Sequence, residues 1–501
     1  MGLRGRTLGV GARLTTVTEQ EAERPTAGRA KERLAGSTIL LTGASGFLGK
    51  AVLATLLRHA GDFRCLLVLL RAPDFAAAQR RLVEEVLTSD AFAALPDASI
   101  REMLDAGRLC TVAGDLETGA LPGPEQEGWS EVDTVIHCAA SVSFENPLDE
   151  ILELNALGPV RLLDSLRDAG ARPHFVHVST VYAADCRTTD TVHEDGLPHP
   201  GVADLEPQAM LEAARKWRAA AQGDSNQSLA RKGRRYAVAA GWPDTYALSK
   251  ALGERLLVER SERTTIVRPS IIESAIRDPY PGWLEGIKVA DPLILAYAAR
   301  GLTHLPGRST NRIDIVPVDY VANACVAAAA HPPTERVRGI AVTSTARNPL
   351  TLGQLAGHIK AHFRREPLRR RNGSEITIGD LQFVNRKVAL RRTIRRERLA
   401  GIVAGVTAAT PVSAAKRRRL RRNSTLAAQV TRMVKIYGPY TELDCVFDDS
   451  NASELARALD PADRADLPFD TGEIDWEDYL EGTHLPRVHR MAERRDGNSS
   501  G

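Results

Sequence analysis

The run from Ser37 to Gly49, Ser-Thr-Ile-Leu-Leu-Thr-Gly-Ala-Ser-Gly-Phe-Leu-Gly, constrains the fold more than any other part of this sequence. An apolar strand breaks into glycines and then feeds a helix rich in Ala and Leu. Glycines at this spacing permit a tight turn, let a pyrophosphate approach the backbone, and let the helix pack close to the strand. The free N–H groups at the start of the helix attract phosphate. We therefore expect cofactor contacts from Gly43, Ser45, Gly46, Phe47, Leu48 and Gly49.

A second motif, Tyr246-Ala-Leu-Ser-Lys250, places a phenol and an ammonium one helical turn apart on the same face. A cation beside a phenol favours the phenolate, so we expect Lys250 to lower the pKa of Tyr246. Each motif alone is weak, because the glycine spacing is not the commonest fingerprint and a Tyr/Lys pair is often a solvated helix face. Together, in this order and context, they indicate hydride transfer to a carbonyl.

Short apolar strands alternate with helices from about residue 34 to 274, which is typical of an α/β doubly wound parallel sheet, the Rossmann fold. Most of these strands are continuous apolar runs, as expected when helices cover both faces of the sheet. The expected strands are Thr38–Thr42, Arg64–Leu70, Leu109–Ala113, Thr134–Cys138, His174–Ser179 and Thr264–Val267. The expected helices are Lys50–Ala60, Phe75–Leu87, Ile151–Ala169 and Asp244–Arg260. The expected helix Glu206–Gln222 lies in an insertion that serves as a surface elaboration, or as a lid or a wall for a large substrate.

The end of the second strand decides which dinucleotide we expect. NAD-specific sites usually carry an acidic residue there, whereas a cation can hold a 2′-phosphate. Arg71, with Arg80 or Arg81, therefore favours NADPH, and the alternative is an ordinary arginine at a strand end. The other expected cofactor contacts are Asp115 and Leu116 after the third strand, Ala139 and Ala140 after the fourth, Pro269 after the sixth, and Tyr246 and Lys250.

The fifth strand ends in two hydroxyl residues that we expect to take part in catalysis. Thr180 is the first choice to bind the substrate carbonyl oxygen beside Tyr246, and Ser179 is the second. In the plainer interpretation both hydroxyls merely cap a turn. Lys250 has a second expected task, a hydrogen bond to the nicotinamide ribose. Asn155 fits a proton relay or a backbone support, and a simple polar helix residue is an equal alternative.

The formal net charge of +3 hides a strong asymmetry. Residues 364–435 hold 20 Lys and Arg against 4 Asp and Glu, whereas residues 436–501 hold 6 against 16. With 501 residues the chain should hold more than one globular unit, and we expect a second, mostly helical C-terminal domain from about residue 350. We expect a disordered leader at 1–34, an NADP-binding reductase domain at 35–350, a basic, partly helical segment at 351–435, an acidic region at 436–490 and a disordered tail at 491–501.

The six cysteines are scattered without a Cys-x-x-Cys pair, which predicts a reduced, cytoplasmic protein without a metal site. The uncharged run Leu399–Ala415 is too short and too rich in Gly, Thr and Pro to span a membrane. Its arginine-rich flanks suit three uses: peripheral contact with an anionic membrane through 386–422, contact with the phosphates of coenzyme A, or solubility with the acidic end folded back. We favour the first two. No motif supports nucleic-acid binding.

Several strings together make the chain resemble the extended short-chain dehydrogenase/reductase superfamily, and more closely its alcohol-forming fatty acyl-CoA reductase branch. The resemblance covers roughly residues 35–490, although the stretch 364–422 is richer in arginine than the family pattern requires. The strings are His137–Phe144, His177–Tyr182, Gly241-Trp-Pro-Asp-Thr-Tyr-Ala-Leu-Ser-Lys250, Arg268–Ile272, Pro281-Gly-Trp-Leu-Glu-Gly286, Asp314–Tyr320, Val446–Asn451 and Ile474–Tyr479.

The resemblance implies NADPH-dependent reduction of a long-chain fatty acyl-CoA to the primary alcohol through an aldehyde, a reaction of lipid metabolism and wax ester biosynthesis. One rival is a thioester reductase that releases the aldehyde. A second is a sugar-nucleotide epimerase or dehydratase, which should hold NAD tightly, and a third is a non-catalytic NADP sensor. Acyl chain length, the acyl carrier and the oligomeric state do not follow from these residues.

Overall fold

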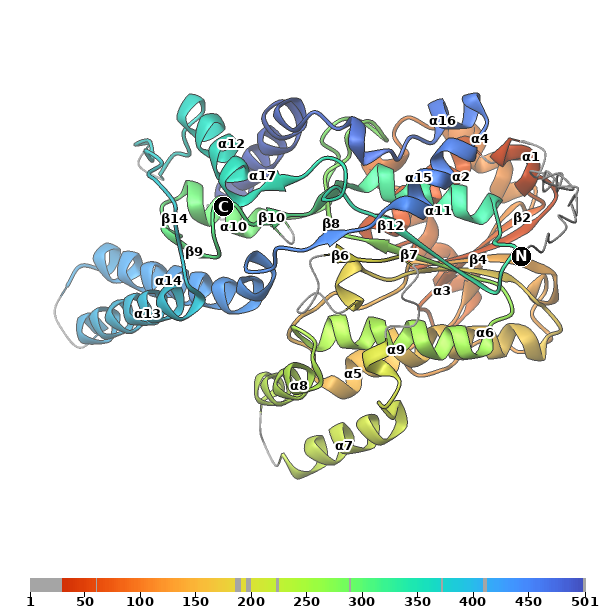
Figure 1. Cartoon of the computed structure of the whole chain (residues 1–501), viewed down its shortest axis with the longest axis horizontal. Helices are drawn as coiled ribbons and strands as arrows, with labels where there is room; N and C mark the ends of the chain where they lie inside the picture. The colour runs from red at the N-terminus through yellow and green to blue at the C-terminus, as the bar shows by residue number, and fades with distance from the viewer. Residues whose placement is uncertain are drawn as a thin grey trace, which may run out of the picture.

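The protein is built around one parallel sheet of seven strands in the order β12-β7-β5-β4-β1-β2-β3 (Figure 1). The computed structural model describes residues 29–498 except 60, 185–190, 195–199, 222–224, 288–289, 371–372 and 409–411. The strand order reverses between β1 and β4, the point where such sheets bind nucleotides. The predicted doubly wound α/β fold is confirmed. The strands are β1 Thr38–Thr42, β2 Cys65–Leu70, β3 Leu109–Ala113, β4 Val132–His137, β5 His174–Val178, β7 Thr264–Pro269 and β12 Val337–Val342.

All six expected strands are present, and the seventh, β12, was not expected. β12 lies at the edge of the sheet and pairs in parallel with β7. Its sequence, Val-Arg-Gly-Ile-Ala-Val, carries a charge and a glycine, because an edge strand need not be apolar throughout. Arg338 of this strand forms an ion pair with Glu454 of helix α15 (Ser450–Ala458), which covers the edge.

Helices cover both faces of the sheet. On one face α2 (Phe47–His59) packs beside α11 (Val318–Ala330), and on the other α6 (Gly158–Asp168) packs beside α9 (Thr245–Arg260). Every residue of α11 is buried, in keeping with its nearly all-apolar sequence. Two covered faces explain why the strands are continuous apolar runs, and each fully buried Leu or Val contributes about 1.5–3 kcal/mol.

The insertion after β5 contains two helices rather than one. α7 (Pro207–Ala220) matches the expected helix, and α8 (Asn226–Ala240) holds the basic patch Arg231–Arg235. Gly233 faces the α5 helix (Leu148–Leu152), where a Cβ would come within 3.0 Å of Leu148. The sequence of α8 shows no clear apolar periodicity, because its buried face consists mainly of small residues.

The C-terminal third adds helices around the carboxyl ends of the strands. A long hairpin, α13 (Arg386–Ala408) and α14 (Ala414–Thr441), projects from the body (Figure 1). No helix within the described ranges is long and apolar enough to cross a membrane. The other elements of this region and of the sheet's rim are α10 Asp291–Ala298, α12 Leu352–Arg365, α16 Pro461–Asp466, α17 Leu485–Asn498, β6 Thr191–Val192, β8 Ile271–Glu273, β9 His304–Pro306, β10 Arg312–Ile313, β11 Ile315–Pro317, β13 Leu350–Thr351, β14 Gln382–Val384 and β15 Val446–Phe447.

The acidic C-terminal region docks on the reductase domain. β15 pairs with β6 of the insertion, so the end of the chain returns to the sheet domain. Arg347 forms ion pairs with Asp449 and Asp470, and Arg312 pairs with Asp444. These arginines belong to the reductase domain, so much of the acidic charge is balanced there rather than by the basic hairpin.

Two expected boundaries differ from the structure. Helix α17 continues into the expected tail as far as Asn498, and its buried residues Leu485, Val488 and His489 lie just before that tail. Within the expected leader, α1 (Ala30–Leu34) buries Ala30 and Leu34, and the Ala30 N–H donates to Asp463 at 2.5 Å. The rest of the leader, residues 1–28, lies outside the described residues, as does Cys186.

Candidate active site

The glycine turn lies between β1 and α2, at the reversal point of the sheet. Gly43 has a φ of 76°, a left-handed conformation that favours glycine. A Cβ on Gly43 would meet the Ala139 nitrogen at 2.6 Å, and a Cβ on Gly49 would meet the Gly43 oxygen at 2.0 Å. Gly46 is less crowded, with only the Gly43 oxygen at 3.3 Å. Two of the glycines therefore close the turn, and the cradle has the geometry that a dinucleotide requires.

The string Pro281-Gly-Trp-Leu-Glu-Gly286 braces the first turn of α2. The rings of Phe47 and Trp283 lie 4.9 Å apart between centroids. Lys50 donates to both carboxylate oxygens of Glu285 at 2.9 Å. Because Trp283 is almost fully buried, these contacts hold the helix N-terminus against the adjoining loop.

Thr180 follows the carboxyl end of β5, Tyr246 lies in the first turn of α9, and the two side chains meet. Their side chains share a hydrogen bond, and Thr180 also accepts from the Tyr182 N–H at 3.4 Å. Lys250, one turn further along α9, donates to the Val178 carbonyl at 2.6 Å. The three side chains line one cavity together with the glycine turn. The structure thus brings together the residues that were expected to carry catalysis.

The expected acidification of Tyr246 by Lys250 is wrong for this arrangement. Burial and the neighbouring Asp244 carboxylate raise the pKa of Tyr246, and only the hydrogen bond from Thr180 opposes them. Burial also lowers the pKa of Lys250 to about 8, which weakens its positive charge. Tyr246 is therefore protonated at neutral pH, and it is suited to donating a hydrogen bond or a proton rather than to accepting one.

Asp244 is a residue of this site that the sequence did not reveal as such. Its carboxylate caps α9 by accepting from the Ala247 N–H at 3.0 Å, and it accepts from the Tyr440 hydroxyl of α14 at 2.5 Å. Burial raises the pKa of Asp244. The bond to Tyr440 ties the C-terminal hairpin to the catalytic helix, and its two partners are far apart in sequence.

Ser179 and Asn155 support the site in different ways. The Ser179 hydroxyl is buried and has no hydrogen-bond partner among the described residues, although Ser179 lines the cavity. Asn155 accepts from the Ser141 N–H at 2.8 Å and donates to Ser249 at 3.0 Å, and Ser249 donates to the Tyr246 carbonyl at 2.8 Å. Asn155 therefore fits the backbone-support alternative, because it connects the loop after β4 to α9.

The residues expected at the adenosine end lie apart from this cavity. Arg71 follows β2, its side chain is 70% exposed, and Glu117 lies 3.7 Å from it. Asp115 lines a separate hollow of about 490 Å³ with Ala72. The Leu116 side chain packs in the core, so a cofactor contact from it would involve its backbone.

The cavity continues from Tyr246, Thr180 and Lys250 into a part lined by apolar side chains, here called the apolar tunnel. It has a volume of about 660 Å³ and begins at the glycine turn. Of the expected contacts, Ser45, Ala139, Arg71, Asp115 and Leu116 do not line it. The tunnel walls come from α10, α12 and α14 and the segments between them: Leu293, Ile294, Tyr297, Leu302, Leu305, Ile313, Leu352, Leu355, Ala356, Ile359, Leu381, Ile436 and Tyr437.

The sequence did not reveal these tunnel residues. Their apolar character is also that of ordinary core residues, and they come from elements that are separate in the chain. No described residue of α7 or α8 lines the cavity, whereas Tyr182, which follows β5, does.

The chain is similar to several known proteins. A family model described as male sterility protein matches residues 41–325, more than half of the chain. Fatty acyl-CoA reductase 1 of Arabidopsis thaliana is 31% identical over 481 residues, covering 90% of this chain and 96% of the relative. The alcohol-forming fatty acyl-CoA reductase of Simmondsia chinensis is 29% identical over 483 residues, covering 91% and 97%.

Solved structures with a similar fold include reductase domains. The terminal R domain from the myxalamid PKS-NRPS biosynthetic pathway has a TM-score of 0.59 at 18% identity, covering 91% of both chains. The reductase domain of a non-ribosomal peptide synthetase from Mycobacterium tuberculosis has a TM-score of 0.52 at 20% identity, covering 92% of this chain and 95% of that one. At such identities these likenesses support the fold alone.

Proposed function

The chain belongs to the fatty acyl-CoA reductase family, and from this premise we propose that it reduces a long-chain fatty acyl-CoA with NADPH to the primary alcohol, through the aldehyde. Membership makes it an oxidoreductase with a nicotinamide cofactor. The observation that carries the finer proposal is the single cavity that joins the Tyr246–Thr180 pair to an apolar tunnel. A long acyl chain fits such a tunnel, because burying each CH₂ contributes about 0.8 kcal/mol.

NADPH suits the residues at the adenosine end. Arg71 lies at the end of β2 with an exposed guanidinium, and its only described ion-pair partner is Glu117 at 3.7 Å. A 2′-phosphate is a stronger partner for this guanidinium than a carboxylate at that distance. The glycine turn and the N-terminus of α2 would hold the pyrophosphate, and Lys250 would hold the nicotinamide ribose.

The first reduction converts the thioester to an aldehyde. Bound NADPH supplies a hydride to the carbonyl carbon. The Tyr246 and Thr180 hydroxyls donate hydrogen bonds to the oxygen that becomes negative, which stabilises the tetrahedral adduct. When the C=O bond re-forms, the C–S bond breaks and coenzyme A leaves as a thiolate, which takes up a proton. No cysteine nucleophile is required.

The second reduction differs in its need for a proton. Hydride addition to the aldehyde would form a C–H bond and turn the C=O bond into a single bond, so the alkoxide oxygen must be protonated. Tyr246, which burial keeps protonated, donates this proton, and the hydrogen bond from Thr180 stabilises the phenolate that remains. The rival in which the aldehyde is released uses the same residues and stops after one hydride. An epimerase or dehydratase, by contrast, has no use for the long apolar tunnel.

The test is product analysis of the purified full-length protein with saturated acyl-CoA esters of increasing length and excess NADPH. We expect primary alcohol, with two NADPH oxidised per ester and better kcat/KM for long chains. Ile359→Trp should shift the preference towards shorter chains, whereas Val238→Trp, at an exposed site on α8, should leave it unchanged. Aldehyde as the sole product supports the rival. No NADPH oxidation with any ester refutes the proposal.

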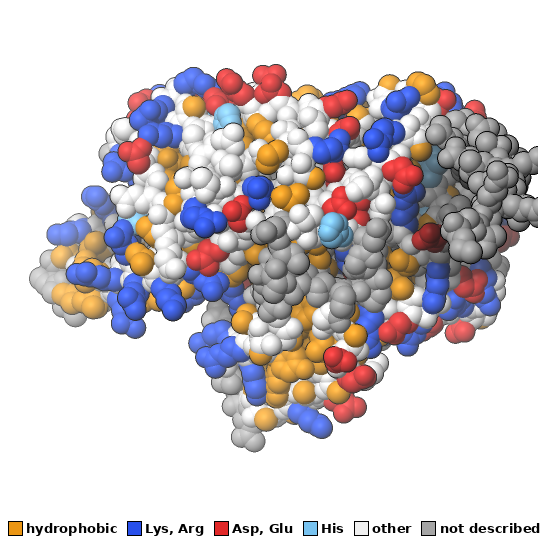
Figure 2. All heavy atoms as spheres, viewed as in Figure 1, with side chains coloured by type: hydrophobic (Ala, Val, Ile, Leu, Met, Phe, Trp, Pro, Cys, Tyr) orange, Lys and Arg blue, Asp and Glu red, His pale blue; other side chains and the backbone are white. Residues whose placement is uncertain are grey.

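We also propose that the α13–α14 hairpin contacts an anionic membrane surface through residues 386–422. Leu399, Ile402, Val403 and Val406 form one helical stripe and are 54%, 62%, 46% and 59% exposed. Figure 2 shows lysine and arginine side chains around hydrophobic ones at this projecting end. Each basic residue near such a surface contributes about 1 kcal/mol, and the apolar stripe adds to it.

Coenzyme A phosphates are the alternative partner of the basic segment. Arg432 is the basic residue of α14 that lines the cavity, and it pairs with Glu145.

Sedimentation with phosphatidylserine vesicles, compared with phosphatidylcholine vesicles, tests membrane contact. Ile402→Ser with Val406→Ser should reduce binding, and Val238→Ser should not. Equal binding by all variants, or no preference for anionic vesicles, would rule out this role of the hairpin.

A further inference from the structure

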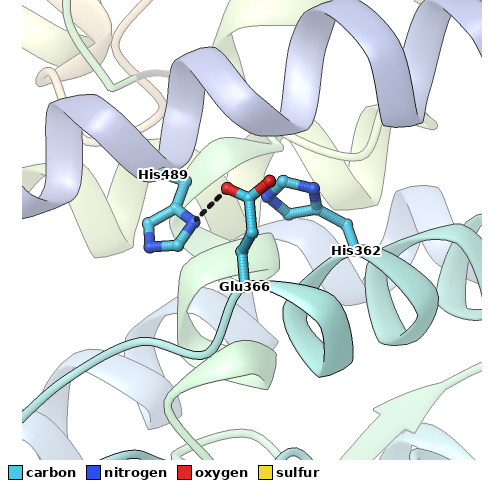
Figure 3. Close-up of side chains that lie close together, drawn as sticks. All are labelled: His362, Glu366 and His489. Carbon is cyan, nitrogen blue, oxygen red and sulfur yellow. Dashed lines mark ion pairs between the residues drawn. The ribbon is translucent and has the colours of Figure 1, made fainter.

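A cluster of histidine and glutamate side chains joins the last turn of α12 to the C-terminal helix α17. α12 lines the tunnel as far as Ile359, and one turn further on it presents His362 and then its C-cap residue, Glu366. His489 of α17 faces them. Figure 3 shows the three side chains of His362, Glu366 and His489 turned towards one another between the two helices.

The spacing of the three groups suits a shared metal ion. One potential ligand atom from each residue lies within 4.8 Å of the others. Glu366 Oε2 and His489 Nδ1 are 3.9 Å apart, too far for a hydrogen bond. A tetrahedral zinc ion with bonds of about 2.0–2.1 Å separates its ligand atoms by about 3.3 Å. A movement of about half an ångström by the Glu366 side chain, which is 64% exposed, would bring the Glu366–His489 pair to this spacing.

The buried imidazoles have nitrogen atoms that need a partner. His362 is 1% exposed and His489 is 6% exposed. His362 Nε2 and both ring nitrogens of His489 have no hydrogen-bond partner within the described part of the chain. Leaving such a group unsatisfied costs about 1–3 kcal/mol.

Glu493 supplies the support that a metal-binding histidine usually has. It lies one helical turn after His489, with Oε1 3.5 Å from His489 Nε2. The two atoms do not form a hydrogen bond in this arrangement. A small rotation of the exposed Glu493 side chain would bring its carboxylate onto Nε2, where it would hold the proton and leave the lone pair on Nδ1, the nitrogen that faces Glu366. The nearby His358 pairs instead with Glu481 at 2.8 Å and is outside the cluster.

We propose that His362, Glu366 and His489 bind one zinc ion, with water as the fourth ligand, and that the ion fastens α17 to α12. Two imidazoles and a carboxylate are a ligand set that zinc accepts readily, whereas magnesium and calcium prefer oxygen alone. The exposed Glu366 leaves a route for the ion to enter. The site is independent of the proposed reaction, and its role is to stabilise the helix that forms one wall of the tunnel.

The experiment is a zinc titration of the full-length protein without an affinity tag, after treatment with a chelator, followed by calorimetry and elemental analysis. We expect one zinc per chain. His489→Ala and Glu366→Gln should each weaken binding at least tenfold, and Glu493→Gln by about tenfold. The matched control is His358→Ala, which lies on α12 as His362 does. It should bind zinc as tightly as the unaltered protein. Glu366→Gln changes an exposed side chain, so its fold should persist, and circular dichroism checks this.

A thermal readout separates a structural ion from loose surface binding. Zinc should raise the Tm of the unaltered protein and of His358→Ala, but not of His489→Ala. Retention of stoichiometric zinc by both Glu366→Gln and His489→Ala would overturn the proposal. So would the absence of binding, or a loss in His358→Ala equal to that in His489→Ala, which would place the ion elsewhere.

Discussion

Replacing Tyr246 by Phe removes one hydroxyl from the cavity and separates the two reductions. In the thioester step Tyr246 is one of two oxyanion donors, and loss of one such donor costs about 10²–10³-fold in kcat. Thr180 remains as the second donor. In the aldehyde step the same hydroxyl also supplies the proton, a contribution of about 10²–10⁴-fold.

The expected result follows from this difference. With acyl-CoA, turnover of Tyr246→Phe should fall about 10²–10³-fold, and with fatty aldehyde as substrate the fall should be larger. Free aldehyde should therefore form a greater share of the product. Stability should change by only about 1 kcal/mol, since the variant loses one hydrogen bond, to Thr180. NADPH absorbance and chromatography of the products measure both effects.

Tyr297→Phe is the matched control. Tyr297 lines the same cavity, and its hydroxyl donates to the Gly379 carbonyl at 3.0 Å, away from the catalytic residues. We expect its kcat for both substrates to stay within about twofold, while its stability falls by about 1 kcal/mol. The reasoning is refuted if Tyr246→Phe keeps a tenth or more of its activity on both substrates, or if Tyr297→Phe loses as much.

Three further predictions concern the cofactor and pH. Gly49→Ala places a Cβ 2.0 Å from the Gly43 oxygen and should abolish NADPH binding in a fluorescence titration. In the control Gly405→Ala the new Cβ meets open space, so this change should stabilise its helix by about 0.5–1 kcal/mol. Tight NADPH binding by Gly49→Ala would contradict the role of the turn. Arg71→Ala should raise the KM for NADPH roughly 10- to 150-fold, since a charged hydrogen bond contributes about 1.5–3 kcal/mol, and leave the KM for NADH unchanged; an equal effect on both would show that Arg71 does not hold the 2′-phosphate. Because the pKa of Lys250 is lowered to about 8, its charge is present below that pH and lost above it, so kcat/KM should fall above about pH 8, and in Lys250→Arg this limb should move to higher pH; an unchanged profile would assign the limb to another group.

The fold was predictable because its signals are local. The strand Thr38–Thr42, the glycine turn and α2 follow each other directly in the chain, and a Cβ at Gly43 or Gly49 would clash with the backbone. Buried parallel strands are apolar along their whole length, so six of them could be located. β12 escaped because it is an edge strand with Arg338 and Gly339 in it.

The site was predictable only in part, because some of its properties depend on burial and on distant contacts. The position of Tyr246 beside Thr180 follows from strand order, but the direction of its pKa shift does not. The Asp244 carboxylate raises the pKa of Tyr246. Its hydrogen bond with Tyr440 exists only when α14 packs against α9. The tunnel likewise needs α10, α12 and α14 together, and no periodicity distinguishes their apolar residues from ordinary core.

The return of the chain's end to the reductase domain has a consequence for biosynthesis. The central sheet is complete once Val342 has left the ribosome, but the tunnel still lacks α14, and the edge of β12 still lacks α15. Domains fold largely from the N-terminus during synthesis. An incompletely synthesised chain therefore exposes the apolar residues of the tunnel and the edge of β12 to solvent. Nascent molecules at this stage need either rapid completion or a chaperone, and stalled synthesis in the basic hairpin would leave them prone to aggregate.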